Sequence, residues 1–407
     1  MKRVPISKPV FDDRDFESAL KPLKSGWVVQ GPFVKDFEER FATFTGAQYA
    51  VATSSCTTAQ LISSMCIGLK ADDEVIVPSF TWISTANSVE FLGSTPVFVD
   101  IDLKTFNIDC KRIEEKITAR TKALYPVNLF GLTADYDSML DTAARRHLAV
   151  VEDCACSLGS YYKSKNNRGP VHSGNFGIIG NFSFHPRKSI TTGEGGMLVT
   201  SDMKIAELAR TFRDHGASRS DLERHRSKKG FLLPEYAHLG FNFRMTDIQG
   251  AIGCSQMEKL PWILEKRRAK AKRYDTLLDH VPFLRKPFVP ENAVHSYQSY
   301  VCLYKPDRIN EILQSKNNVV ERIQALSDER NKLMLRLEEI GIATRQGTHC
   351  VAIQTYYAKR YQIRPEDYLN GYIADRCSLT LPLYAMMTDE DQDRVIGKIK
   401  EMAKGIG

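Results

Sequence analysis

Between about residues 45 and 200 the sequence alternates between two kinds of segment, and this alternation restricts the possible folds more than any other feature. Short apolar segments rich in valine or aromatic residues predict β-strands in DEVIVPSF, STPVFVDID, TKALYPVNLFG, HLAVVEDCA and GMLVT. Amphipathic segments between several of them, such as TTAQLISSMCIGL and TADYDSMLDTAARRHL, predict helices. The alternation predicts an α/β protein with a mostly parallel central sheet and helices on both faces. In such sheets ligands bind beyond the carboxyl ends of the strands, so residues at those ends are the first candidates for a functional site.

The composition of the 407-residue chain excludes several classes of protein. No apolar run approaches the roughly 18 residues that a membrane span needs, and the start, MKRVPISKPVFDDRDF, lacks the apolar core of a secretory signal. The nine cysteines include no CxxC pair, which is typical of a reducing compartment and not of a disulfide framework or a zinc site. We therefore expect a cytoplasmic protein without a metal and without a membrane segment.

After about residue 255 the pattern changes to long helical segments. Short strands are expected in SYVCLYKP and IADRCSLTLPL, and a final helix in DEDQDRVIGKIKEMAKG, which together predict a second, smaller α/β domain. Residues 265–275, EKRRAKAKRYD, hold six Lys or Arg in a helical pattern, and the whole chain has a net charge of +7. We interpret this run as a solvated helix face. The alternative, a nucleic-acid-binding surface, has no recognisable binding motif to accompany it, and we expect no nucleic-acid partner.

Several chemically useful residues follow the predicted strands. Glu152 and Asp153 end one strand, Trp82 follows another, and Lys188 follows the apolar run FSF. Residues 53–61, TSSCTTAQL, place hydroxyl groups directly before a helix, whose N-terminal amides attract anions. Taken singly, these features are more often a surface lysine, a turn carboxylate, a core tryptophan and a helix cap.

Pyridoxal phosphate is a cofactor that needs all of these features together. It requires a lysine for a Schiff base, an acid that keeps the ring nitrogen protonated, an anion cradle for the phosphate and an aromatic ring that stacks on it. The combination therefore favours pyridoxal 5′-phosphate as the cofactor, with Lys188 as the nucleophile and proton carrier.

The segment FSFHPRKSITTGEGG resembles the signature of the DegT/DnrJ/StrS family of sugar aminotransferases, in which FSFHxxKxxxxGEGG carries the cofactor lysine. The resemblance covers about residues 5–300 and 330 to the end. Further blocks match the family in its order: SGWVVQGPFVKDFEERFA, SSCTTAQL, DEVIVPSFTWISTANSVEFLGSTPVFVDID, PVNLFG, VEDCA and LGFNFRMTDIQGAIG. The resemblance implies a fold type I pyridoxal-phosphate-dependent transferase that acts as a homodimer with shared active sites. It also implies an N-terminal arm at 1–25, a large cofactor-binding domain at 26–255 and a small C-terminal domain at 256–407.

The resemblance assigns roles to particular residues. Lys188 is the Schiff-base lysine, Asp153 pairs with the pyridine nitrogen, and Trp82 stacks on the ring. The phosphate cradle and the rest of the cofactor pocket are expected to include Ser55, Cys56, Thr57, Cys156, Ser183 and Asn242, the last from the other subunit. Candidate substrate contacts are His185, Glu194, Arg345 and His349, although Arg345 and His349 are equally interpretable as ordinary loop residues.

The chain departs from the family pattern at three places. Cys56 occupies a position where the family often has glycine, and Cys156 one where it usually has glutamine, so the polarity of the pocket differs there. Residues 309–328 look inserted and predict one charged amphipathic helix, either a surface protrusion or a partner contact.

Some relatives carry histidine at the lysine position and dehydrate sugars, so the presence of Lys188 implies a two-step amino transfer. The expected donor is L-glutamate and the expected acceptor a nucleotide-linked 4-keto-6-deoxyhexose. Two alternatives remain open: amination of a non-sugar cyclic ketone such as a cyclitol, and a non-catalytic regulator of the same fold that binds the cofactor or a sugar. The intact Lys188 and Asp153 argue against a regulator.

Overall fold

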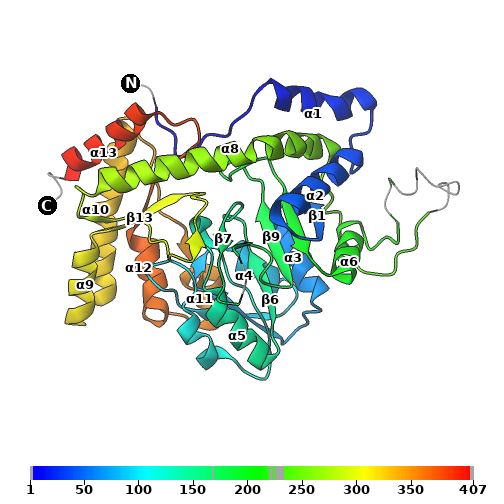
Figure 1. The fold of residues 1–407 in the computed structure, drawn as a ribbon. Coiled ribbons are helices and arrows are strands. Elements are labelled where there is room, and N and C mark those ends of the chain that lie inside the picture. Colours follow the sequence, from blue (N-terminus) through cyan, green and yellow to red (C-terminus); the bar gives the residue numbers. More distant parts are fainter. Residues whose placement is uncertain (1–2, 167–168, 220–221, 223–224, 226–232, 404–407) are drawn as a thin grey trace.

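The computed structural model describes residues 3–166, 169–219, 222, 225 and 233–403, and it is built around a seven-stranded sheet (Figure 1). The strand order is β1-β10-β9-β6-β5-β2-β4. The strands are β1 (Tyr49–Thr53), β2 (Glu74–Pro78), β4 (Thr95–Val99), β5 (Thr121–Leu124), β6 (Ala149–Asp153), β9 (Ile179–Ser183) and β10 (Gly196–Thr200). Only β10 is antiparallel to its neighbours, which confirms the prediction of a mostly parallel sheet.

The five strands predicted from the sequence are β2, β4, β5, β6 and β10. Strand β9 was not predicted, because Gly180 and Asn181 interrupt its apolar residues. Gly180 is needed there, since a Cβ atom at that position would lie 2.4 Å from the Cα atom of Gly174. A strand defined by such a close backbone approach has no apolar signature of its own.

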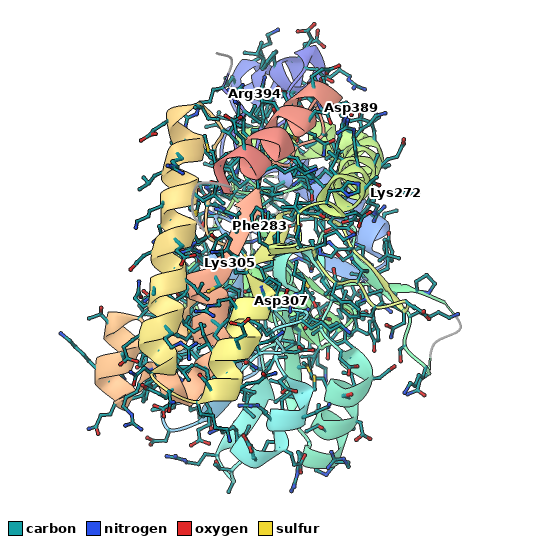
Figure 2. All side chains as sticks on the ribbon, turned by 90° about the vertical axis from the view of Figure 1, so that its left-hand side faces the viewer. Lys272, Phe283, Lys305, Asp307, Asp389 and Arg394 are labelled. Carbon is teal, nitrogen blue, oxygen red and sulfur yellow. The ribbon has the colours of Figure 1, made fainter. Side chains whose placement is uncertain are left out.

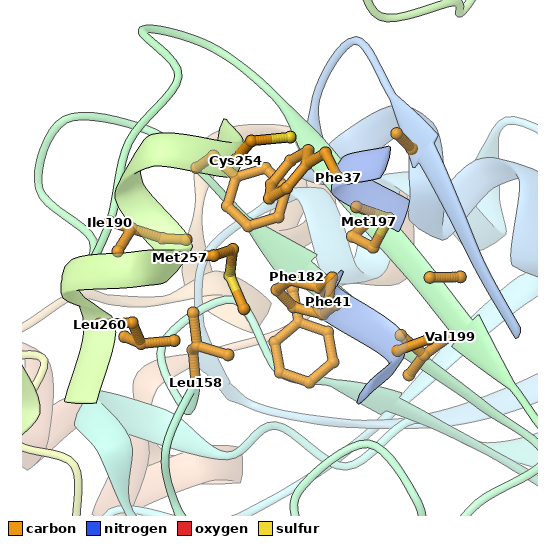
Figure 3. Close-up of a cluster of buried hydrophobic side chains, with 14 of the residues drawn as sticks. Phe37, Phe41, Leu158, Phe182, Ile190, Met197, Val199, Cys254, Met257 and Leu260 are labelled. Carbon is orange, nitrogen blue, oxygen red and sulfur yellow. The ribbon is translucent and has the colours of Figure 1, made fainter. Parts of the chain in front are cut away.

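Helices cover both faces of the sheet. On one face, α2 (Pro32–Thr45) and the first half of α8 (Asp247–Leu278) pack on alternate residues of the strands, including Met197 and Val199 (Figure 3). On the other face, α3 (Cys56–Cys66) and α6 (Met203–Arg213) pack against Val51 and Leu198. Successive side chains of a strand point to opposite faces, so this burial on both sides explains the almost continuous apolar runs of the sequence.

Helix α8 continues past the central sheet into the C-terminal part of the chain (Figure 1). There it packs with β13 (Tyr300–Tyr304) and α13 (Asp389–Ala403), next to the small antiparallel sheet of β13, β11 (Leu284–Arg285) and β15 (Ser378–Leu381). The domain boundary predicted at 255/256 falls inside this helix, and the division into domains stays a prediction. Within the described residues no helix has the length and apolar character needed to cross a bilayer.

The basic run at 265–275 is only in part the solvated face that the sequence suggested: Lys272 is exposed, but two arginines turn inward. Arg267 is buried, and its guanidinium donates to the backbone oxygens of Tyr297 and Gln298. Arg268 donates to the backbone oxygen of Gly159 at 2.6 Å. These cations tie α8 to loops of the same chain because backbone oxygens replace the water that each guanidinium loses on burial.

The predicted single helix at 309–328 was wrong: the structure has two helices, α9 (Pro306–Ser315) and α10 (Val319–Glu339), which lie side by side (Figure 2). The chain breaks between them because Lys316 and Asn318 are left-handed, with φ of 56° and 46°. Ile309 and Ile323 are fully buried against α12 (Leu369–Cys377), so the pair forms part of a core and is not a surface protrusion. The first part of IADRCSLTLPL belongs to this helix α12, and only its second part is the strand β15.

Candidate active site

A cavity of about 330 Å³ opens at the carboxyl ends of the parallel strands. It collects most of the residues that the sequence singled out, from segments far apart in the chain. Those residues are Ser55, Cys56, Thr57, Trp82, Asp153, Cys156, Ser183, His185, Lys188, Glu194 and Arg345. Two predicted residues, Asn242 and His349, do not line it.

Lys188 lies in the turn between β9 and β10. Its backbone N–H donates to the His185 oxygen at 2.8 Å, which fixes the turn. Its Nζ atom lies 3.3 Å from the Cys156 Sγ atom, and among the described residues it has no carboxylate within ion-pairing distance. The amine is therefore held at the cavity with no carboxylate against it, where a ligand can reach it.

Asp153 ends β6 and is almost fully buried. Its Oδ2 atom accepts hydrogen bonds from Gln60 Nε2 at 2.6 Å and Thr85 Oγ1 at 2.7 Å, while Oδ1 accepts from the Ala155 N–H at 3.0 Å. All three contacts donate to the carboxylate, which keeps acceptor capacity for one further positively charged donor.

Sequence reasoning missed Gln60 and Thr85, which hold this carboxylate. Gln60 lies on α3 and Thr85 on α4 (Ser84–Glu90), and both side chains are buried. One feature of the sequence could have indicated Gln60: it is a polar residue on the apolar face of the predicted helix. A polar side chain buried in this way needs a hydrogen-bond partner inside the protein.

The start of helix α3 forms an anion cradle. Ser55 is the N-cap: its Oγ atom accepts from the Thr58 N–H at 3.2 Å, and the Ser55 N–H donates to Thr58 Oγ1 at 3.1 Å. The first-turn amides of Cys56 and Thr57 have no partner within the helix, and both residues line the cavity, where the helix dipole favours negative charge. The strand after Lys188 must pass close by, because a Cβ atom at Gly196 would lie 2.4 Å from the Ser55 oxygen.

The remaining predicted residues lie at the rim. Trp82 is 56% exposed, and its ring centroid is 6.1 Å from that of His349, which borders the cavity without lining it. An exposed tryptophan beside a cavity is suited to stacking on a flat ligand. Asn242 is exposed on a separate segment that bridges to Asp214, and its role toward the other subunit stays a prediction.

The cavity also holds two arginines, one of which sequence reasoning had not named as a site residue. Arg187 lines it beside Arg345, and Gln298 Nε2 donates to the Arg187 backbone oxygen at 2.8 Å. Burial lowers the pKa of His185, and the nearby Arg187 lowers it further. The two arginines therefore contribute positive charge to the cavity.

These residues fit pyridoxal phosphate. The cavity offers an amine without an ion pair, a buried acceptor-only carboxylate, a helix start for the phosphate and an exposed aromatic ring. Within the described chain, no group of three or more His, Cys, Asp or Glu residues is arranged to hold a metal ion.

Comparison with known proteins leads to the same class. A model of the DegT/DnrJ/EryC1/StrS aminotransferase family matches residues 9–400, and the chain belongs to that family. It is 35% identical to the spore coat polysaccharide biosynthesis protein SpsC of Bacillus subtilis (strain 168), over 99% of this chain and 97% of that protein. It is 34% identical to GDP-perosamine synthase of Caulobacter vibrioides, over 99% of both chains. The solved structure of Helicobacter pylori PseC, an aminotransferase involved in the biosynthesis of pseudoaminic acid, superimposes with a TM-score of 0.86 at 26% identity, covering 99% of this chain and 100% of that chain.

The chain is therefore a pyridoxal-phosphate-dependent sugar aminotransferase, and the predicted family, fold type, cofactor and enzyme class are confirmed. The alternative of a non-catalytic regulator is not retained. When bound, the cofactor supplies an electron sink for the carbon next to the transferred nitrogen. The protein supplies the cavity around it, which Lys188 and Asp153 both line, and their predicted roles toward the cofactor stay predictions.

Proposed function

We propose that this enzyme transfers the amino group of L-glutamate to the ketone of a nucleotide-linked 4-keto-6-deoxyhexose. The observation that carries the proposal is the Lys188 amine, which lies at the cavity without an ion pair and within the same walls as Asp153 and the anion cradle of α3. A relative named GDP-perosamine synthase supports a nucleotide-linked sugar as the acceptor class.

Each residue has a defined task in this reaction. Lys188 removes a proton from the donor carbon in the first half and returns one to the acceptor carbon in the second. Asp153, which Gln60, Thr85 and Ala155 hold in place by hydrogen bonds, accepts from the proton-bearing ring nitrogen throughout. The amides of α3 fix the phosphate, which sets the distance between the reacting atoms and Lys188.

The test is an absorbance spectrum of the purified protein with pyridoxal phosphate, recorded from about 300 to 500 nm, the range in which that cofactor absorbs. L-glutamate should remove the yellow band and raise the near-ultraviolet band of the aminated cofactor, and the correct keto sugar should restore the yellow band. The Lys188→Ala variant should not interconvert the two bands. No response to glutamate would contradict the donor, and recovery with a cyclitol ketone instead of a nucleotide-linked sugar would support that alternative.

We also propose a homodimer with shared active sites. Exposed apolar side chains lie near Asn242 in the sequence, at Leu239 and Phe241, and on the first helix, at Phe16 and Leu20, and a monomer rarely exposes so many. If Asn242 acts in the partner's site, mixed dimers of Lys188→Ala and Asn242→Ala subunits will regain activity that neither variant has alone. Mixed samples without any gain would contradict the shared site. The cytoplasmic location stays a prediction.

A further inference from the structure

Two arginine side chains lie in the catalytic cavity without a counter-ion. Arg187 and Arg345 both line it, and both also line a narrower recess that continues from it toward Ser7. Across the described part of the chain, neither guanidinium forms an ion pair with a carboxylate, although many other arginines do. Glu194 lines the same cavity but is not within ion-pairing distance of either one.

The arrangement is electrostatically unfavourable as it stands. The Nε atom of Arg345 is buried and has no hydrogen-bond partner. Burial lowers the pKa of Arg345, and the positive charge of Arg187 lowers it further. A buried guanidinium next to a second one costs free energy unless an anion with matching acceptors completes the site. The backbone nevertheless fixes Arg345 there, because its N–H and oxygen both bond to Thr380 of β15.

The position of the pair indicates which anion it receives. Arg187 directly precedes Lys188, and both arginines line the same cavity as the Lys188 amine, the proposed reacting group. The start of α3, the proposed cradle for the cofactor phosphate, lines this cavity with its own residues, Ser55, Cys56 and Thr57. An amino-acid donor carries a carboxylate on the reacting carbon itself, whereas the diphosphate of a nucleotide-linked sugar lies beyond the width of the sugar ring. A guanidinium also matches a carboxylate in geometry, since its N–H groups form a planar fork.

We infer that Arg345 and Arg187 form the carboxylate receptor for the amino donor. This assignment rests on the proposed aminotransfer and deepens it, because it names the residues that select an anionic amino acid over a neutral amine. Arg345 is the principal contact, as its Nε atom lacks any other partner, and Arg187 adds charge.

The experiment measures binding and not turnover. Calorimetric titration of the wild-type enzyme loaded with pyridoxal phosphate uses glutarate, a dicarboxylate without an amine, and separately guanosine diphosphate and thymidine diphosphate. Arg345→Gln should weaken glutarate binding by about 10- to 100-fold, Arg187→Gln by less, and neither should change nucleotide binding by more than about twofold. Arg345→Lys should recover only part of the loss, because an ammonium group keeps the charge but not the fork.

Arg308→Gln is the matched control, because Arg308 is an exposed arginine on α9 that pairs with Glu311, and it should bind glutarate as the wild type does. Circular dichroism and the cofactor absorbance show whether each variant is folded and loaded. The inference is overturned if glutarate does not bind to the wild type, if Arg345→Gln binds it normally, or if the arginine variants lose nucleotide binding instead. The proposed function fails on a different result, namely that no keto sugar restores the yellow band of the aminated wild-type enzyme.

Discussion

Two lysines of this protein lie in opposite kinds of environment. Lys259 on α8 is buried and pairs with Asp15 of α1 (Asp13–Ser25), and the same carboxylate accepts from Ser255 Oγ at 2.8 Å and Gln256 Nε2 at 3.0 Å. Lys188 lies at the cavity, and within the described residues its amine contacts the Cys156 thiol and no carboxylate. The first region pairs its charges and so holds the N-terminal helix against the body, while the second leaves an amine without an ion pair, free to contact a ligand.

The comparison shows how a site and a structural contact differ when both use the same residue type. A buried ion pair is costly to break, because removal of one partner leaves the other charge without compensation. An amine without an ion pair contributes little to the free energy of unfolding, but it can bond to a ligand. Substitutions in the two regions should therefore separate activity from stability.

The largest effect is expected from Lys188→Ala. Amino transfer should fall by at least about 10⁴-fold, because the nucleophile and the proton carrier are the same group. The midpoint of thermal unfolding, measured without cofactor, should change little. A stable variant that keeps more than a few per cent of the wild-type rate would contradict the role of Lys188.

Lys259→Met should have the opposite profile. It leaves Asp15 buried and unpaired, so the free energy of unfolding should fall by about 3–5 kcal/mol in urea titrations. Activity at low temperature should stay close to that of the wild type. Lys398→Met, which removes an exposed pair with Glu401, is the control and should cost less than about 1 kcal/mol. Equal losses in the two variants would show that the Asp15 pair is not a tether.

Gln60→Leu sharpens the comparison inside the active site. It removes one of the donors that hold Asp153, and kcat should fall by about tenfold, since one hydrogen bond to a charged group is lost. Stability should fall by about 1–3 kcal/mol, because buried Asp153 loses a donor, although the Gln60 Oε1 atom has no partner to lose. Gln60→Glu places a second carboxylate there and should lower kcat further. If kcat is unchanged in both variants, the hydrogen bonds from Thr85 and Ala155 are enough to hold Asp153, and the role given to Gln60 is contradicted.

The smallest effect concerns acid stability away from the site. His172 is buried, its Nε2 atom accepts from the Gly159 N–H at 2.8 Å, and burial lowers its pKa from 6.5 to about 4. The unfolded chain therefore binds more protons than the folded chain between these pH values, so this contribution to stability is complete above about pH 6.5 and is lost as the pH falls toward 4. His172→Gln should flatten the pH dependence by up to about 1.4 kcal/mol per pH unit in that window. An unchanged slope would assign the acid sensitivity to other groups, such as His295, whose pKa burial lowers to about 3.

Much of the fold was predictable, and the failures have identifiable causes. The strands β2, β4, β5 and β6 follow from runs of valine and aromatic residues that parallel sheets bury on both faces. The break between α9 and α10 was missed because Lys316 and Asn318 adopt left-handed backbone without the glycine that usually signals it. The basic run on α8 was in part misinterpreted because a charge pattern does not show which cations meet backbone oxygens.

In the site, too, some features were predictable from the sequence and others were not. Glu152 and Asp153 are neighbours in sequence, and the sequence could not distinguish their surroundings. Alternation along β6 sends them to opposite faces: Glu152 accepts from Tyr136 and from backbone amides that include that of Gly174, while Asp153 accepts from Gln60 of α3. Only the second of these faces is the one that opens on the cavity.

The sequence alone therefore determined the family and the class of fold, and it predicted Lys188 and Asp153 as the residues that serve the cofactor. These are properties of short segments, since strand propensity, helix capping and the spacing of a motif are local. The tertiary structure decided which residues support the acid and where the two arginines meet. Gln60 lies 93 positions from Asp153, and Gln298 lies 111 positions from Arg187. Contacts over such separations depend on how helices pack on a sheet, and no local pattern in the chain encodes them.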